Sequence, residues 1–322
     1  MNVLISGANG FIGKSLCAEL LRQGQLVRAA VRLMRFDNLP IENAETTSIG
    51  VIDGETDWTH ALLDINVVVH LAARVHLIKD NAVDPLDELR KVNVEGTWNL
   101  ARQAAEAGVQ RFIFISSIKV NGESTSLGRP YTTEDQPAPV DPYGISKLEA
   151  EESLRQLADE TGMEVVIIRP PLVYGPGVKA NFYNMMCWLE EGVPLPLGAI
   201  YNKRSFVALD NLVDLIVTCI EHPAAANRTF LAGDGEDLST TELLQRMSKA
   251  LGKPAKLFPM PIGVLKAAAI LLGRRDMAQR LCNSLQVDIS KTCDLLGWQP
   301  PVSVDDALKR TAADFLQKLK AV

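Results

Sequence analysis

The sequence predicts an α/β fold, in which a doubly wound parallel sheet is joined to a smaller C-terminal domain. Apolar segments of strand length alternate with amphipathic segments of helix length, and this alternation is typical of parallel sheets. Residues 66–73 (NVVVHLAA) form a continuous apolar run, as expected of a strand that is buried on both faces. The chain has 322 residues, of which 47% are hydrophobic, and can bury a large core.

The predicted elements follow one another from the N-terminus. Strands are predicted at residues 2–6, 26–31, 66–73, 111–116 and 164–168, helices at residues 11–23, 92–107 and 142–161, and a strand followed by a helix within residues 206–221. Gly24, Gly108 and Gly162 are expected to end the three helices, because glycine readily adopts the left-handed conformation found there. Asp141 is expected to cap the third helix, with Pro142 in its first turn.

A glycine-rich turn, SGANGFIG, lies between the first predicted strand and the first predicted helix. Gly7 would allow a tight turn with positive φ, Gly10 would let the backbone approach a pyrophosphate, and Gly13 would let helix and strand pack closely. The helix that begins at Phe11 and Ile12 would offer free N–H groups to the phosphates. This strand–turn–helix context predicts a Rossmann-type site for NAD(P).

The end of the second predicted strand favours NADP(H) as the cofactor. An acid that binds the adenosine ribose is expected there, but Val31 and Arg32 occupy the place and Arg35 lies nearby. Arginine can pair with a 2′-phosphate, although a solvated surface arginine explains the pattern equally well. Asp53 follows a further predicted strand, between those at residues 26–31 and 66–73, and is expected either to bond the adenine or to stabilise a turn.

Ser117, Tyr143 and Lys147 form the predicted catalytic set. Tyr143 and Lys147 are four residues apart on one predicted helix and therefore share a face. A nearby ammonium lowers the pKa of a phenol, which is otherwise about 10 and too high for proton transfer at neutral pH. Ser117 ends a strand, so its hydroxyl would lie at the carboxyl edge of the sheet, where it could hold a substrate oxygen. A YxxxK pair alone is more typical of a solvated helix face, but together with the glycine turn it predicts hydride-transfer chemistry.

Seven segments carry a resemblance that covers nearly the whole chain: GANGFIG, NVVVHLAA, NVEGTWN, FIFISS, DPYGISK, IIRPPLVYGPG and LGWQP. Together they resemble the extended short-chain dehydrogenase/reductase family, and more narrowly its nucleotide-sugar epimerase/dehydratase branch. The resemblance implies an N-terminal Rossmann domain with tightly bound NAD(P), a small C-terminal domain for the nucleotide sugar, and often a homodimer built on two helices per subunit.

The resemblance also implies roles for individual residues. Tyr143 would be the acid/base, Lys147 its partner and a ligand of the nicotinamide ribose, and Ser117 the contact to the substrate hydroxyl. Asn93 would lie near the cofactor. Four more residues at predicted strand ends are expected to line the cofactor site: Leu71, Ala72, Ala73 and Pro170.

Three reactions are open in this branch: 4,6-dehydration, C4 epimerisation and reduction of a 4-keto sugar. Dehydratases carry an Asp-Glu pair after the catalytic hydroxyl, whereas Ile118 and Lys119 stand here, so dehydration is disfavoured. Arg32 favours NADPH, and SSIKVNGE resembles sugar 4-ketoreductases of bacterial surface-polysaccharide pathways. These two observations favour a 4-keto-sugar reductase, with a nucleotide-sugar 4-epimerase as the alternative. A non-catalytic NADP(H)-binding sensor or scaffold is disfavoured because the catalytic set is complete.

Three residues are expected to contact a nucleotide sugar, with UDP as the expected carrier. Arg204 stands where the family places an arginine on the diphosphate, Asn181 follows the YGPG loop, and Lys119 could face the sugar pocket. A surface or structural role is the alternative for each. The predicted dinucleotide-binding domain comprises residues 1–169 plus about 204–232, and the substrate domain about 170–203 plus 233–322.

Composition restricts the class of protein further. The net charge of −6 argues against a surface for nucleic acid. Five scattered cysteines without a CxxC pair favour reduced thiols over a disulfide framework, and no metal is expected. The N-terminus carries no signal-type apolar run, so a cytoplasmic location is expected. The apolar residues 262–273 are too few for a membrane span and predict a packed helix, although they leave a lipid-diphosphate carrier open.

Overall fold

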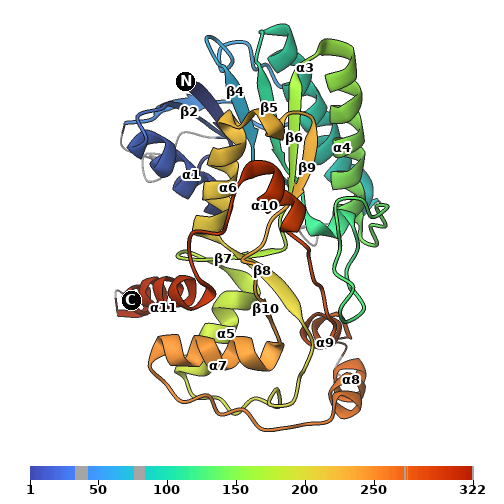
Figure 1. Ribbon diagram of the computed structural model, residues 1–322, viewed down its shortest axis with the longest axis vertical. Helices are drawn as coiled ribbons and strands as arrows, with labels where there is room; N and C mark the ends of the chain where they lie inside the picture. Colours follow the sequence, from blue (N-terminus) through green and yellow to red (C-terminus); the bar gives the residue numbers. More distant parts are fainter. Residues whose placement is uncertain (33–42, 76–83, 272, 274, 321–322) are drawn as a thin grey trace.

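The computed structural model describes residues 1–32, 43–75, 84–271, 273 and 275–320. Figure 1 shows a larger unit at the top, built on a broad sheet, and a smaller unit below it that contains β7, β8 and β10. The larger sheet has seven strands in the order β3-β2-β1-β4-β5-β6-β9, and all its neighbouring strands are parallel. The predicted doubly wound α/β fold is confirmed.

The winding of the larger sheet reverses between β1 and β4, which are neighbours in the sheet. In folds of this kind ligands bind at such a reversal, outside the carboxyl ends of the strands. The strands of this sheet are β1 (Asn2–Ser6), β2 (Leu26–Val31), β3 (Glu45–Ser48), β4 (Val67–His70), β5 (Arg111–Ile115), β6 (Glu164–Arg169) and β9 (Arg228–Leu231).

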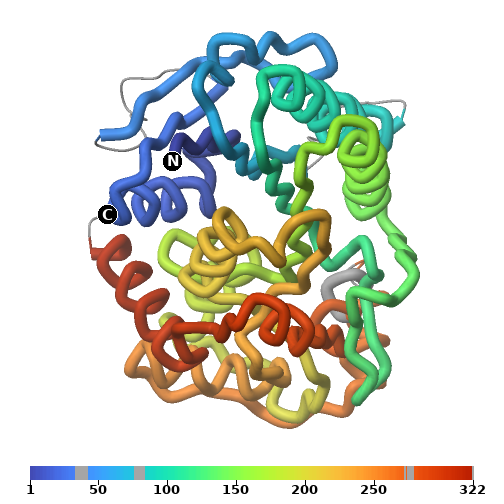
Figure 2. The backbone as a smooth tube through the Cα atoms, turned by 45° about the horizontal axis from the view of Figure 1, so that its top comes forward, coloured from blue at the N-terminus to red at the C-terminus, as the bar shows by residue number. Residues whose placement is uncertain are grey.

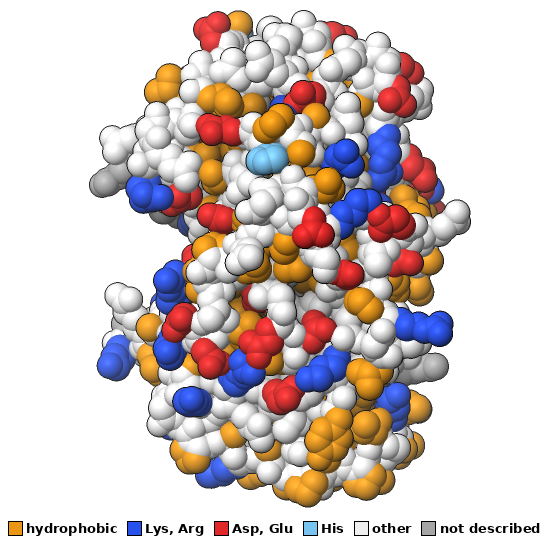
Figure 3. Space-filling view, in the orientation of Figure 1, with side chains coloured by type: hydrophobic (Ala, Val, Ile, Leu, Met, Phe, Trp, Pro, Cys, Tyr) orange, Lys and Arg blue, Asp and Glu red, His pale blue; other side chains and the backbone are white. Residues whose placement is uncertain are grey.

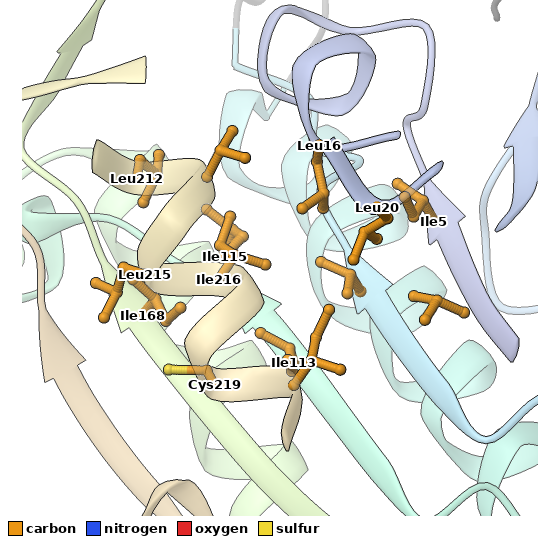
Figure 4. Packing of buried hydrophobic residues seen from close by; sticks show 14 of the residues in the cluster. Ile5, Leu16, Leu20, Ile113, Ile115, Ile168, Leu212, Leu215, Ile216 and Cys219 are labelled. Atoms are coloured by element: carbon orange, nitrogen blue, oxygen red, sulfur yellow. The ribbon is translucent and has the colours of Figure 1, made fainter. Parts of the chain in front are cut away.

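Helices cover both faces of the larger sheet because its central strands are apolar on both faces. In β4, Val67 and Val69 pack into one core cluster and Val68 packs into the cluster on the opposite side. Figure 4 shows the first cluster, where leucine and isoleucine side chains of two helices meet isoleucines of β1, β5 and β6. The helices on this face are α1 (Phe11–Arg22) and α6 (Leu209–Glu221), and those on the other face are α3 (Gly96–Glu106) and α4 (Pro142–Thr161).

Helix α4 has the ends that its sequence predicts. The Asp141 carboxylate accepts a hydrogen bond of 2.7 Å from the backbone N–H of Gly144, and Pro142 is the first helical residue. Gly162 ends the helix with a φ of +74°. Since these caps satisfy backbone groups at both ends, α4 begins and ends at defined residues, and the positions of Tyr143 and Lys147 in its first turns are fixed.

The helix predicted at residues 92–107 is part of a longer, irregular one. The segment starts with α2 (Pro85–Arg90), continues as a π-helical turn (Lys91–Glu95) and ends as α3. A Cβ atom at Gly96 would lie 2.8 Å from a side-chain carbon of Ile52, so α3 passes very close to the loop after β3. π-helical turns often mark functional sites, and this one carries Asn93.

The smaller unit is built on a three-stranded sheet in the order β10-β8-β7. Its strands β7 (Leu172–Tyr174) and β8 (Arg204–Ala208) are parallel, whereas β10 (Asp237–Leu238) is antiparallel to β8. A separate core cluster joins this sheet to its helices. Those helices are α5 (Ala180–Glu190), α7 (Thr240–Leu251) and α11 (Val304–Lys320). After β8 the chain returns to the larger unit through α6 and β9, so the predicted domain boundary near residue 204 falls at a strand of the smaller sheet; the domain division itself stays a prediction.

One predicted helix differs from its expectation. The apolar residues 262–273 form α8 (Ile262–Leu271), in which Leu265 packs against the core of the smaller unit but no residue is fully buried, so the helix is less enclosed than its sequence predicts. Figures 1 and 2 place α7 and α8 at the opposite end of the molecule from β1 and β2. In the described ranges no helix is both long and apolar enough to cross a membrane. The remaining helices are α9 (Arg275–Cys282), α10 (Ser290–Leu296), and the short turns at Ile118–Val120 and Pro223–Ala225.

Candidate active site

The glycine turn after β1 has the geometry of a phosphate-binding loop. Gly7 has a φ of +72°, and a Cβ atom there would lie 2.9 Å from the backbone nitrogen of Ala72. A Cβ atom at Gly13 would lie 2.3 Å from the carbonyl oxygen of Gly7, so any side chain at position 13 would push α1 away from the glycine turn. Gly10 precedes α1, and no side chain among the described residues caps that helix. The first N–H groups of α1, beginning at Phe11, are therefore placed to hold an anion.

The loop after β4 runs beside this turn. Leu71 donates a backbone hydrogen bond of 3.2 Å to the carbonyl of Ser6, and Ala72 and Ala73 follow it. The buried amide of Asn93 accepts from the N–H of Arg74 at 2.8 Å and donates to its carbonyl at 3.0 Å. The same amide nitrogen donates to the Ser146 hydroxyl of α4 at 3.0 Å. Asn93 thus joins the loop after β4 to α4, and its place near a cofactor stays a prediction.

Arg32, Arg35 and Asp53 are the residues predicted to contact the adenosine half of the cofactor. Arg32 is exposed at the end of β2, and Arg35 lies outside the described residues. The Asp53 carboxylate accepts hydrogen bonds of 3.0 Å from the backbone N–H of Glu55 and from the Thr56 hydroxyl. These contacts support the alternative in which Asp53 stabilises a turn, and a contact to adenine stays a prediction.

Lys147 is buried beneath the carboxyl edge of the sheet. Its ammonium donates a hydrogen bond of 2.8 Å to the carbonyl of Ile115, the last residue of β5, and lies 4.2 Å from the centre of the Phe114 ring. Burial lowers the pKa of Lys147 to about 7, and the negative charge of Glu151 acts in the opposite direction. Lys147 therefore changes its charge near neutral pH, which an exposed lysine does not.

Tyr143 lies one helical turn before Lys147, and Ser117 follows β5 closely. Burial raises the pKa of the Tyr143 phenol to about 12, and the carboxylate of Asp141 raises it further. The Ser117 hydroxyl accepts a hydrogen bond of 3.2 Å from the backbone N–H of Lys119, and Pro170 accepts one of 3.0 Å from the N–H of Ile118. The ends of β5 and β6 and the start of α4 therefore meet, as the catalytic prediction requires.

Lys119 forms an ion pair with Asp141, the residue that caps α4. A second carboxylate, that of Glu123, lies 3.3 Å from the same ammonium. Lys119 thus pairs with the residue that caps α4, and Asp141 stands two residues before Tyr143. This position fits a role at the sugar pocket and equally a role in the electrostatics of Tyr143.

The two other predicted substrate contacts lie in the smaller unit. The Arg204 guanidinium donates from Nη1 to the carbonyls of Arg280 at 2.9 Å and Asn283 at 3.1 Å, and so holds the end of α9. Burial lowers the pKa of Arg204, and the nearby charge of Arg280 lowers it further. Asn181 is exposed in the first turn of α5, after Ala180 with a φ of +55°. Their contacts with a substrate stay predictions.

Comparison with known proteins decides the family. Residues 3–233 match the NAD dependent epimerase/dehydratase family. The chain belongs to this family. The resemblance found in its motifs is thereby confirmed, and the chain is an enzyme of the extended short-chain dehydrogenase/reductase type.

Relatives in the family extend over nearly the whole chain. A UDP-glucose 4-epimerase of Vibrio cholerae is 50% identical over 320 residues, which are 98% of this chain and 96% of that protein. The N-acetyl-alpha-D-glucosaminyl-diphospho-ditrans,octacis-undecaprenol 4-epimerase of Escherichia coli O157:H7 is 28% identical over 96% of this chain and 94% of that protein. A crystal structure of UDP-glucuronic acid 4-epimerase from Bacillus cereus in complex with NAD has the same fold, with a TM-score of 0.80, 24% identity and coverage of 100% of this chain and 99% of that chain.

In this epimerase/dehydratase-family chain, sequence reasoning missed a buried ion pair that lies one turn of α4 beyond Lys147. The Glu151 carboxylate accepts bonds from Arg169 at 2.8 and 2.5 Å and from the Ser116 hydroxyl at 2.6 Å. Arg169 also donates to the Asn121 side chain at 2.9 Å. The network joins α4 to the ends of β5 and β6. A signal was present, since Glu151 stands four residues after Lys147 on the same helix face.

Proposed function

We propose that the chain is a UDP-sugar 4-epimerase that uses NAD, instead of the 4-keto-sugar reductase that the sequence favours. The observation that carries this proposal is the 50% identity, over nearly the whole of both chains, to a protein named UDP-glucose 4-epimerase. The preference for NADP(H) rests on Arg32, which is exposed at the end of β2, and the matched family is described as NAD dependent. The support for reduction is therefore weaker than the support for epimerisation.

The loop between β1 and α1 fits a dinucleotide. Side chains at Gly7 and Gly13 would collide with backbone atoms, so the turn keeps its N–H groups and the start of α1 open to a pyrophosphate. The loop after β4 would hold the adjacent part of the cofactor. When bound, NAD supplies reversible hydride exchange with C4 of the sugar. The protein's own residues supply the proton transfer and the positioning.

Tyr143 is proposed to move the proton of the C4 hydroxyl, and Ser117 to hold the same oxygen. The phenol has a pKa raised to about 12, so at neutral pH it is protonated and can donate. As a base it needs a positive charge nearby, because an adjacent cation stabilises the phenolate. Lys147 lies one turn away, and its pKa of about 7 lets it carry that charge or release it near neutral pH. The pair can therefore move a proton in both directions, which an epimerase requires.

The nucleotide that remains bound to the purified chain tests the proposal. An epimerase regenerates its cofactor in each turnover and need not exchange it, whereas a reductase consumes a reduced cofactor. We expect denaturation of the chain after gel filtration to release close to one NAD per chain, identified by mass spectrometry. A chain that releases no nucleotide and instead binds NADPH reversibly from solution would contradict the proposal. Tyr143→Phe is the matched control, since it removes one hydroxyl and should retain the same nucleotide.

A further inference from the structure

His70, the last residue of β4, is a buried histidine that takes no part in the proposed proton transfer. Its exposed fraction is 0%, so the histidine visible at the surface in Figure 3 is a different one. Its Nδ1 atom lies 2.5 Å from the hydroxyl of Ser6, its neighbour on β1 and the residue before the glycine turn. Its Nε2 atom lies 3.0 Å from the hydroxyl of Thr97, in the first turn of α3. The imidazole therefore joins α3 to the two strands between which the winding of the sheet reverses.

The hydroxyl of Thr97 decides which nitrogen of His70 carries the proton. This hydroxyl has one proton and donates it to the carbonyl of Asn93 at 2.7 Å. It therefore accepts a hydrogen bond from Nε2–H, and Nδ1 accepts one from the Ser6 hydroxyl. The opposite tautomer would leave the Ser6 proton without an acceptor among the described residues, because the other contact of this hydroxyl is the N–H of Ala72 at 3.4 Å. Only the Nε2–H tautomer satisfies every member of the network.

The surroundings of His70 keep its imidazole neutral. Burial lowers the pKa of His70 to about 3, and the positive charge of Lys147 acts in the same direction. The Phe114 ring lies against both groups: its centre is 5.9 Å from that of the imidazole, at an angle of 17°, and 4.2 Å from the Lys147 ammonium. A second proton on His70 would also break its bond from Ser6, because Nδ1 would then be a donor. The imidazole thus has one donor and one acceptor, and both are used.

The network of His70 continues to the helix that carries Tyr143. The Asn93 side chain donates to the Ser146 hydroxyl at 3.0 Å, and this hydroxyl donates to the carbonyl of Tyr143 at 2.9 Å. Bulk water does not reach the side chains of this path, so the loss of one hydroxyl would leave a buried polar group unpaired. Five buried residues therefore join the glycine turn to the first turn of α4: Ser6, His70, Thr97, Asn93 and Ser146.

We propose that His70, as a neutral imidazole protonated on Nε2, is a positioning residue that fixes the glycine turn and the start of α3 relative to each other and so preorganises the cofactor site. The inference rests on the proposed function, because it takes the glycine turn to be the place where the dinucleotide binds. Ser6 directly precedes Gly7, and its oxygen also accepts from Ala72 in the loop after β4. The hydroxyl that His70 orients therefore contacts both loops. Loops that are already ordered lose less freedom when a ligand binds, which strengthens binding.

Conservative variants of Thr97 test this role. Substitution of His70 itself would remove a buried ring and destabilise the fold, so the variants change its partners. Thr97→Val keeps the shape of the side chain but leaves Nε2–H unpaired, and should weaken NADH binding about tenfold in a fluorescence titration. Thr97→Ser keeps the hydroxyl and should bind NADH as the parent does. Thr311→Val is the matched control, because Thr311 is equally buried in α11 and donates the same kind of bond, to Ala307 at 2.7 Å.

Two further measurements examine the imidazole. Ser6→Ala should also weaken NADH binding, and the effects of Ser6→Ala and Thr97→Val should be less than multiplicative in the double variant, because both act through His70. In ¹⁵N nuclear magnetic resonance spectra of the histidine-labelled chain at pH 7, the imidazole whose signals shift in Thr97→Val should carry its proton on Nε2.

The proposal is wrong if that proton is on Nδ1, if Thr97→Ser weakens binding as much as Thr97→Val, or if the two single effects multiply. It is also wrong if Thr311→Val weakens NADH binding as much as Thr97→Val, since any lost buried hydroxyl would then suffice. A chain that binds NADPH but not NADH would contradict the proposed function instead, and the same affinities measured with NADPH would decide the role of His70.

Discussion

The ammonium of Lys147 donates a hydrogen bond of 2.8 Å to the carbonyl oxygen of Ile115. This bond joins α4 to the last residue of β5, and Ser117 follows two residues later. The bond therefore fixes α4, which carries Tyr143 and Lys147, relative to the strand end that precedes Ser117. The bond uses one of the three donors of the ammonium, so donors remain for the cofactor ribose that Lys147 is predicted to bind.

Tyr143→Phe is expected to lower kcat by about 10²–10⁴-fold with UDP-glucose as substrate, because it removes the group that transfers the C4 hydroxyl proton. Cofactor content should not change, since the phenylalanine keeps the apolar contacts of the ring. Steady-state kinetics and nucleotide analysis of the same preparation check both statements. Full activity in the variant would remove Tyr143 from the mechanism.

Lys147 should make the stability of the cofactor-free chain depend on pH. Its pKa is about 7 when folded and higher when unfolded, so between these values the unfolded chain binds the extra proton and stability rises with pH. We expect the unfolding free energy of the parent, relative to Lys147→Met, to rise by about 1.4 kcal/mol per pH unit between about pH 8 and about pH 10, and to level off above the ordinary pKa of a lysine. Denaturant titrations across this range measure it.

A control distinguishes the buried lysine from lysines in general. Lys309 has a side chain that is 66% exposed, so the stability of Lys309→Met should follow the parent across this alkaline range. If the difference between the parent and Lys147→Met does not change with pH, the charge of Lys147 does not respond to burial in the way proposed.

Lys119→Met is expected to raise the kinetic pKa of Tyr143 by up to about one pH unit, because it leaves the charge of Asp141 unbalanced beside the phenol. Lys119→Arg should restore the parental profile. The pH dependence of kcat/KM with UDP-glucose is the measurement. A raised KM for UDP-glucose with an unaltered pH profile would show that Lys119 contacts the substrate instead.

Arg204→Ala is expected to raise KM for UDP-glucose by about tenfold or more, since a lost arginine–phosphate pair weakens binding by a charged hydrogen bond or two. In the described residues the guanidinium uses only Nη1, on the two carbonyls at the end of α9, so its other nitrogens could serve a diphosphate. Lys203→Ala changes the neighbouring cation and should have a small effect. An unaltered KM with a lowered melting temperature would limit Arg204 to holding α9.

Glu151→Gln should lower the unfolding free energy by about 3–5 kcal/mol, because it leaves the buried Arg169 without its counter-charge. Glu152 is exposed on the next position of the same helix, so Glu152→Gln is the matched control and should change stability little. Denaturant unfolding compares the two variants. Equal stabilities would mean that the ion pair between Glu151 and Arg169 contributes little.

The parts of the fold that depend on local patterns could be predicted from sequence. The apolar run at β4, the cap at Asp141 and the glycine turn each require only neighbouring residues, and each has its expected form. The bounds of the edge strand β3, with the sequence ETTS, could not be predicted in this way, because none of its four side chains is buried. The same limit explains α8, whose apolar sequence does not reveal whether a partner element covers it.

The contacts of the candidate site depend on residues far apart in the chain. Lys119 meets Asp141 across 22 residues, and Arg204 meets the backbone of Arg280 across 76. Such long-range pairs leave no periodic pattern in the sequence. The sequence could therefore indicate that Lys119 and Arg204 lie near a site, but not which groups each of them contacts. Asn93 shows the same limit, since its amide bonds the backbone of Arg74 and the Ser146 hydroxyl.

The most direct test of the account is to incubate the purified chain with UDP-glucose alone and to follow the anomeric protons by nuclear magnetic resonance. An NAD-retaining 4-epimerase should form UDP-galactose without added nucleotide, and Tyr143→Phe should form almost none. If no UDP-sugar is converted without an added reductant, and a 4-keto sugar nucleotide is reduced when NADPH is supplied, the chain is a reductase and the central claim is wrong.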